Sequence, residues 1–149
     1  LFQADLENLD DLKLDENFDV IIAGEMIEHL NNPGLFLNGI KRYMDKSSEL
    51  VVTTINAYSA LRFAMYALRG KGGANEPVHP DHVAYYSYKK LNLLIERHGL
   101  SVKRFDLYDI GQEHRVFMHW YQKWLNDVAV KVSRQLSDGV IAVVELNEG

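Results

Sequence analysis

The chain has 149 residues, 47% of them hydrophobic and 25% charged, which is the size and composition of one globular domain with a real core. It contains no cysteine, so disulfides and thiolate metal sites are excluded, and we expect a cytoplasmic location. The net charge of −5 disfavours a nucleic-acid partner. Residues 1–18 lack the pattern of a signal peptide and no apolar run has membrane-spanning length, so we expect no membrane association.

Two short, nearly continuous apolar runs predict strands covered on both faces, as in a parallel sheet. They are FDVIIA (18–23) and ELVVTT (49–54). Between them a helix should begin at Pro33 with Asn32 as its cap, because proline is favoured at the first helical position. The apolar residues of that helix fall on one face: Phe36, Ile40, Tyr43 and Met44.

The rest of the chain continues this alternation of helices and strands. The expected elements are a helix over 57–69, a Gly- and Pro-rich loop over 70–84, a helix from a Ser87 cap to His98 ended by Gly99, a strand over 100–108, a helix over 117–136 and a strand over 140–146. The long helix carries an apolar stripe of Phe117, Tyr121, Trp124, Val128 and Val132. This order predicts an α/β sheet with helices on both faces and ligands bound beyond the carboxyl ends of its strands.

The segment after the first strand, GEMIEHL (24–30), carries two carboxylates and an imidazole. If it is helical, Glu25, Glu28 and His29 lie at i, i+3 and i+4 on one face. Such a set suits a divalent cation, Mg²⁺ or Mn²⁺, and His79 or His82 from the 70–84 loop could complete it. The alternative is structural: acidic residues complement the dipole at a helix start, and a nearby histidine packs or caps.

Three tyrosines lie where the 70–84 loop meets the next helix, in AYYSY (84–88). Their rings could stack on a flat ligand. Core packing at a helix start is the alternative, and we expect it for at least two of them.

These segments resemble class I methyltransferases that use S-adenosylmethionine. The resemblance rests on FDVIIAGEMIEHLNNPGLFLNGIKRYM, ELVVTTINAYS and HPDHVAYYSYKKLNLLIERHGLSVKRF, and the branch with ubiquinone-type O-methyltransferases is the most similar. It covers residues 1–108, whereas 109–149 match only in outline, as an added helix and a closing strand. It implies one partial domain over 1–149, a Rossmann-like sheet made of the family's fourth to seventh strands, and methyl transfer to a hydroxyl of a small molecule.

The resemblance also implies contacts with S-adenosylmethionine. Asp5 and Leu6 match the acidic motif after the family's third strand, where the Asp contacts the adenine amino group and the next backbone contacts the ring. Ala23, Gly24 and Glu25 fall where the backbone after the fourth strand lines the methionine and ribose.

A metal site is implied by the pattern Glu25-x-x-Glu28-His29, which binds a divalent cation in ubiquinone-type O-methyltransferases and in small-RNA 3′-terminal 2′-O-methyltransferases. The RNA enzymes add a histidine that resembles His82. A cation held by Glu25, Glu28, His29 and His82 would lower the pKa of the substrate hydroxyl. Without a metal, His29 would act as the general base.

The chain departs from the family because it lacks the Gly-rich turn after the first strand and the acidic residue after the second. We therefore expect it to be inactive alone, as a fragment, one half of a split enzyme, or a degenerate protein. A non-catalytic α/β interaction module is the alternative, and a dinucleotide-dependent enzyme is disfavoured because it has no need of GEMIEHL. Without a neighbouring first strand, residues 18–23 would form an exposed apolar edge that recruits a second copy or a partner.

Overall fold

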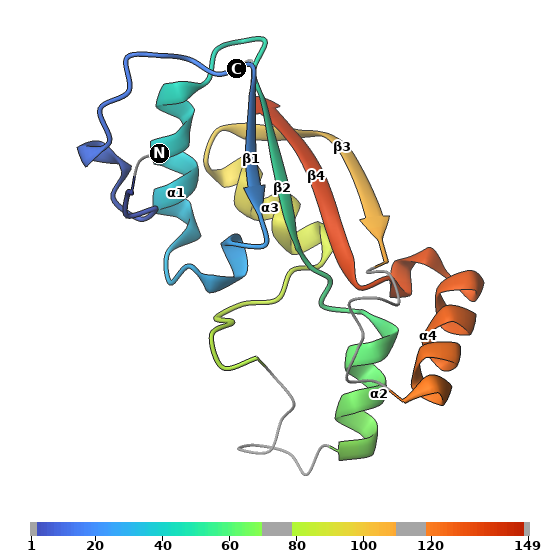
Figure 1. The fold of residues 1–149 in the computed structure, drawn as a ribbon. Coiled ribbons are helices and arrows are strands. Elements are labelled where there is room, and N and C mark those ends of the chain that lie inside the picture. The colour runs from blue at the N-terminus through green and yellow to red at the C-terminus, as the bar shows by residue number, and fades with distance from the viewer. Residues whose placement is uncertain (1–2, 70–78, 110–118, 148–149) are drawn as a thin grey trace.

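The computed structural model describes residues 3–69, 79–109 and 119–147, which build one mixed sheet with helices around it (Figure 1). The strands are β1 (Val20–Gly24), β2 (Glu49–Ile55), β3 (Leu100–Tyr108) and β4 (Gly139–Leu146). The helices are α1 (Pro33–Ile40), α2 (Ala60–Arg69), α3 (Tyr88–Arg97) and α4 (Trp120–Val132). All lie close to the predicted ranges, although residues 70–78 of the expected loop and 117–118 of the expected long helix lie outside the described residues. None of the described helices is long and apolar enough to cross a membrane.

The strand order β1-β2-β4-β3 confirms the α/β fold class. β1 and β2 are parallel, and β4 is antiparallel to both β2 and β3. The chain crosses from β1 to β2 through α1, and from β2 to β3 through α3. Both crossovers move in the same direction across the sheet, from β1 toward β3. Because such crossovers are right-handed, α1 and α3 lie on the same face.

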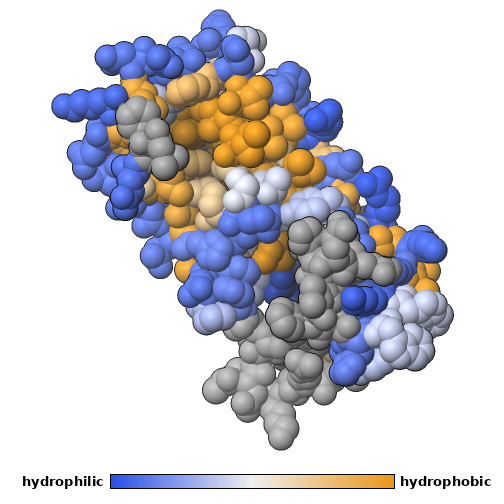
Figure 2. All heavy atoms as spheres, in the orientation of Figure 1, coloured by the Kyte–Doolittle hydropathy of each residue, from blue (hydrophilic) through white to orange (hydrophobic). Residues whose placement is uncertain are grey.

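The other face differs from the expectation that helices cover both. Within the described ranges it carries no helix, and α2 and α4 lie instead beyond the carboxyl ends of β1, β2 and β3 (Figure 1). Val20 and Ile22 of β1 are 54% and 74% exposed there. Figure 2 shows an apolar patch over the sheet on the face turned away from α3. The sheet therefore presents an apolar face as well as the predicted apolar edge at β1.

The core lies between the other side of the sheet and the helices α1 and α3. It contains Phe36 and Leu37 of α1, Leu91 and Ile95 of α3, and Leu50, Val52, Val140, Ala142 and Val144 of the sheet. The α1 helix begins at Pro33 as predicted and ends at Ile40. Phe36 is buried and Ile40 is half-buried on it, whereas Tyr43 and Met44 are buried in and just after the 3-10 turn Lys41–Tyr43. Packing of two helix faces on alternate strand residues thus builds the core.

The helix ends follow the sequence only in part. Asn32 and Ser87 occupy the predicted N-cap positions of α1 and α3, but their side chains make no cap hydrogen bond. At α1 the Asn32 backbone N–H instead donates to Glu7 Oε1 at 2.5 Å. Gly99 does follow the end of α3 with a φ of +72°, the left-handed conformation for which glycine is favoured.

The predicted apolar stripe of the 117–136 helix is not buried. Trp124 is 59% exposed and Val132 is 81% exposed, and Trp120 at the helix start is 78% exposed. The helix also ends at Val132, after which Arg134–Leu136 form a 3-10 turn. Because α4 lies beside α2 beyond the sheet, its apolar residues have no core to enter (Figure 1).

Candidate functional site

The candidate site lies at the carboxyl ends of β1 and β2. The Glu25 backbone N–H donates to both the carbonyl oxygen and the Oγ1 of Thr53 at 3.1 Å, which fixes the chain as it leaves β1. Ile27–His29 then form a 3-10 turn in which Ile27 and Glu28 are fully buried. The segment therefore turns inward at the edge where α/β sheets bind ligands.

The expectation that Glu25, Glu28 and His29 share one helical face is wrong. Glu25 has a φ of +48°, a left-handed conformation that few non-glycine residues adopt. The chain reverses there, and only one 3-10 turn follows. Glu25 is not among the residues whose ligand atoms the structure brings together with Glu28 and His29, and its role as a metal ligand stays a prediction.

The structure does bring Glu28, His29 and His82 together, and we call these three the acid–imidazole cluster. Their ligand atoms lie within 4.8 Å of one another. The loop that carries His82 is fastened to the turn because the N–H groups of Val83 and Ala84 donate to the Glu28 carbonyl at 2.8 and 3.2 Å. Backbone pairing thus holds a distant histidine against the turn.

The ring of His29 is oriented by the same loop. Its Nδ1 lies 3.0 Å from the carbonyl oxygen of Asp81. A carbonyl only accepts hydrogen bonds, so Nδ1 carries the proton and Nε2 is left with a free lone pair. Histidines that bind a metal through one ring nitrogen typically donate a hydrogen bond from the other.

Two buried polar atoms of the acid–imidazole cluster lack partners among the described residues. Glu28 Oε2 accepts a hydrogen bond from Thr54 Oγ1 at 2.7 Å, but Glu28 Oε1 and His82 Nδ1 have none. Leaving such an atom unpaired costs about 1–3 kcal/mol. Burial lowers the pKa of His82, and the neighbouring His79 and His29 lower it further, which favours the neutral imidazole that binds metals. The donor set therefore fits a divalent cation.

Glu25 has a different partner, Tyr108 at the end of β3. The Tyr108 hydroxyl donates to Glu25 Oε1, and its ring lies over Gly139 of β4. Burial raises the pKa of Tyr108, and hydrogen bonding to the Glu25 carboxylate raises it further. The sequence analysis missed Tyr108 and also Thr54. Thr54 is a fully buried hydroxyl, and its signal was a polar side chain at a core-facing position of β2.

Tyr108 is expected to stay protonated in the folded protein at pH values where exposed tyrosines ionise. Its pKa lies above the usual value of about 10, so its contribution to stability is present below that pH and is lost as the pH rises through the folded-state pKa. Alkaline titration of tyrosinate absorbance should lose a late-ionising component in Tyr108→Phe. Tyr86, whose pKa burial also raises, should ionise late in both proteins. Identical curves for both proteins would contradict a shielded Tyr108.

Gly139→Ala is expected to destabilise the fold by about 1–3 kcal/mol through overpacking. A Cβ at Gly139 would lie 2.3 Å from Cζ of Tyr108, whose hydroxyl is held by Glu25. Gly24→Ala is the matched control, because a Cβ there would meet nothing closer than Thr53 Oγ1 at 3.8 Å. Urea unfolding measures both, and equal effects would show that the Tyr108 ring moves aside freely.

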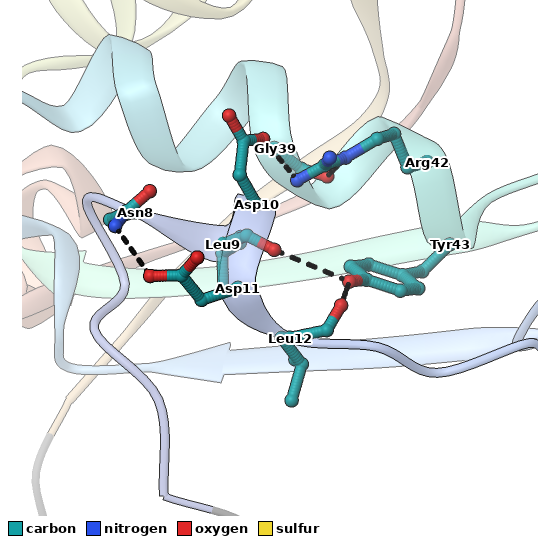
Figure 3. A network of polar contacts seen from close by, with 8 residues as sticks. All are labelled: Asn8, Leu9, Asp10, Asp11, Leu12, Gly39, Arg42 and Tyr43. Carbon is teal, nitrogen blue, oxygen red and sulfur yellow. Dashed lines mark hydrogen bonds and ion pairs between the residues drawn. The ribbon is translucent and has the colours of Figure 1, made fainter.

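The N-terminal segment is anchored along α1 and the turn that follows it (Figure 3). The Tyr43 hydroxyl donates to the carbonyl of Leu9 at 3.4 Å and to that of Leu12. Arg42 pairs with Asp10 at 2.6 Å. These contacts fix the position of the segment that begins with the predicted adenine-binding residues.

The residues predicted to contact the cofactor lie at two places. Ala23 and Gly24 are the last residues of β1, and Ala23 is buried. Asp5 and Leu6 are exposed, and Asp5 Oδ1 accepts a hydrogen bond from the Glu7 N–H at 2.9 Å. Glu7, two residues after Asp5, accepts a hydrogen bond from the Asn32 N–H between the 3-10 turn and α1. Their binding of S-adenosylmethionine stays a prediction.

Comparison with known proteins identifies related sequences and folds. A family model described as a methyltransferase domain matches residues 2–104. No sequence among curated proteins matches the chain. A SAM-dependent methyltransferase from Archaeoglobus fulgidus aligns with a TM-score of 0.61 and 15% identity, over 98% of this chain and 66% of that one.

Two further solved structures share the fold. The mitomycin 7-O-methyltransferase aligns with a TM-score of 0.59 and 13% identity, over 96% of this chain and 32% of its own. Magnesium protoporphyrin IX methyltransferase from Synechocystis, with bound S-adenosylhomocysteine, aligns with a TM-score of 0.57 and 10% identity, over 97% and 49%. At these identities the likeness shows the fold, and this chain spans from about a third to two thirds of the length of the three structures.

Proposed function

This chain belongs to the methyltransferase domain family whose model matches its residues 2–104, and we propose that it serves the transfer of a methyl group from S-adenosylmethionine to a hydroxyl of a small molecule. The observation that carries the choice of a hydroxyl is the buried Glu28 Oε1, which lies without a partner among the described residues beside two imidazoles. The cluster lies at the carboxyl end of the sheet, where folds of this kind bind their ligands. Within the family, the segments FDVIIAGEMIEHLNNPGLFLNGIKRYM and ELVVTTINAYS support the ubiquinone-type O-methyltransferase branch, and the Glu25-x-x-Glu28-His29 pattern is compatible with it. The cytoplasmic location stays a prediction.

We propose that the acid–imidazole cluster holds a divalent cation. Glu28 supplies the negative charge, and the two histidines supply neutral nitrogen donors. Thr54 holds one oxygen of Glu28, and the Asp81 carbonyl orients His29, so the donors are positioned before the cation arrives. Two nitrogen donors favour Mn²⁺ over Mg²⁺, which prefers oxygen ligands.

Each group has one part in the reaction. The donor supplies a methyl carbon whose bond to the sulfonium sulfur breaks, with the electron pair left on sulfur, as its bond to the acceptor oxygen forms. A bound cation supplies positive charge that lowers the pKa of the acceptor hydroxyl. If the cluster works without a cation, His29 Nε2, free of the Asp81 contact, takes the hydroxyl proton instead.

The test is transfer of a tritiated methyl group from S-adenosylmethionine to catechol in the full protein that contains this chain. Removing metal with EDTA should abolish transfer, and adding Mn²⁺ should restore it more fully than adding Mg²⁺. Transfer that continues unchanged in EDTA would support His29 as the base and reject the cation. Absence of calorimetric binding of S-adenosylmethionine would reject methyl transfer and favour a non-catalytic interaction module.

We also propose that this chain pairs through β1 with a strand from a second copy or from another part of a split enzyme. The supporting observation is the 74% exposure of Ile22 on a strand that pairs only with β2 in the described part of the chain. An unpaired strand with apolar side chains is a template for further pairing. Light scattering should show a dimer, and Ile22→Lys should reduce it to a monomer. A monomer at all concentrations would contradict the pairing.

A further inference from the structure

A cavity of about 750 Å³ lies between the start of α3 and the sheet. Its apolar lining comes from Tyr88, the first residue of α3, and from Phe105, Leu107 and Val140 of the sheet. The cavity shares no residue with the acid–imidazole cluster. Its volume falls in the range of about 300–1,000 Å³ that small-molecule sites occupy.

The cavity exists because α3 is too short to cover β3 completely. Leu107 pairs with Val140, and both side chains point to the face that α1 and α3 cover. Phe105 and Leu107 are nevertheless only half-buried, since α3 begins at Tyr88, whose ring meets that of Phe105 edge-on at 4.6 Å between centroids. Apolar side chains of β3 that face the core therefore lie beyond the first residue of α3, where they line the cavity.

The charged residues that line the cavity are lysines. Lys89 and Lys90 are the second and third residues of α3, and none of the described residues that line the cavity is acidic. Neither lysine has a hydrogen bond or ion pair with any residue in the described ranges. In a chain of net charge −5, these two ammonium groups are a local positive charge that no described acidic side chain pairs with.

The N-terminus of α3 adds to this positive charge. Ser87 makes no side-chain cap, and no acidic residue occurs in the first turn of α3. The first N–H groups of a helix have no acceptor within it, and the helix dipole makes that end positive. Cations are unfavourable at this end of a helix, so a bound anion would stabilise the position of both lysines.

We propose that this cavity binds an amphipathic anion, with its apolar body against Tyr88, Phe105 and Leu107 and its anionic group at Lys89 and Lys90. The shared chemistry of the ligand is an aromatic or aliphatic body that ends in a carboxylate or a phosphate. This proposal is independent of the proposed methyl transfer, because the amphipathic anion would bind without S-adenosylmethionine or a metal.

The test is isothermal titration calorimetry with three probes that share one ring system: 2-naphthoate, 2-naphthyl phosphate and the neutral 2-naphthalenemethanol. At least one anion should bind at least tenfold more tightly than the alcohol, and the tighter of the two anions identifies the class. Lys89→Gln/Lys90→Gln should weaken anion binding roughly tenfold and leave alcohol binding unchanged. Tyr88→Ala should weaken all three probes, because it removes an apolar wall.

The matched control is Lys46→Gln/Lys131→Gln, which makes the same charge change at exposed lysines outside the cavity. It should leave binding of the anions unchanged. The proposal is overturned if both double variants weaken the anions equally, if the alcohol binds as tightly as the anions, or if no probe binds.

Discussion

Glu28→Gln is expected to weaken Mn²⁺ binding at least 100-fold and to leave the stability of the fold within about 1 kcal/mol of the parent. Glu28 is the only carboxylate of the acid–imidazole cluster, and it is fully buried. Its substitution removes the one negative donor, which should cost more than the 10–100-fold loss typical of residues that merely support a ligand.

The stability is expected to change little because glutamine keeps the shape of the side chain. Its amide oxygen can still accept the hydrogen bond from Thr54 Oγ1 that Glu28 Oε2 receives at 2.7 Å. The variant exchanges a buried charge with one unpaired oxygen for a neutral amide with one unpaired N–H₂ group, and removing an uncompensated buried charge is often neutral or favourable. Glu28→Gln should therefore lose Mn²⁺ affinity while its free energy of unfolding stays close to that of the parent.

Mn²⁺ titration calorimetry and urea unfolding are the two measurements. Glu25→Gln is the informative comparison, because the sequence pattern includes Glu25 among the ligands whereas the structure pairs it with Tyr108. We expect Glu25→Gln to lose less than tenfold in Mn²⁺ affinity. Equal losses for the two variants would mean that Glu25 leaves Tyr108 to join the cation, and an unchanged affinity for Glu28→Gln would remove the cluster as a metal site.

Leu37→Ala is expected to destabilise the protein by about 2–5 kcal/mol, a large part of the 5–15 kcal/mol that holds a typical domain folded. Leu37 has no exposed surface and packs in the core between α1 and the sheet. Alanine would remove three carbon atoms and leave a cavity that rigid strands on one side cannot close. The cost combines the lost burial with the cavity itself.

Leu35→Ala is the matched control on the same helix, because Leu35 is 47% exposed and lies outside the core cluster. It should change the free energy of unfolding by no more than about 0.5 kcal/mol. Urea unfolding of the two variants gives the comparison. A similar loss for both would mean that helix propensity, and not burial against the sheet, decides the stability of α1.

Local sequence patterns, which span only a few residues, were sufficient to predict where most helices and strands lie. Continuous apolar runs located β1 and β2, Pro33 located the start of α1, and Gly99 located the end of α3. The same reasoning failed for α4, whose apolar stripe is exposed, because periodicity reports that a helix has an apolar face and not whether a core lies beside it. Asn32 occupies the predicted N-cap position, yet its side chain makes no cap hydrogen bond, and its backbone N–H donates to Glu7 from outside the helix.

For the site, the sequence by itself determined which acidic and imidazole side chains were candidates and which family the chain belongs to, because residue types and their local spacing carry both. Only the tertiary structure decided which residues meet. A left-handed Glu25 turns one carboxylate toward Tyr108, and backbone hydrogen bonds from Val83 and Ala84 bring His82 onto Glu28. These contacts join segments far apart in the chain, and their energies depend on sheet order and burial, which no local pattern encodes.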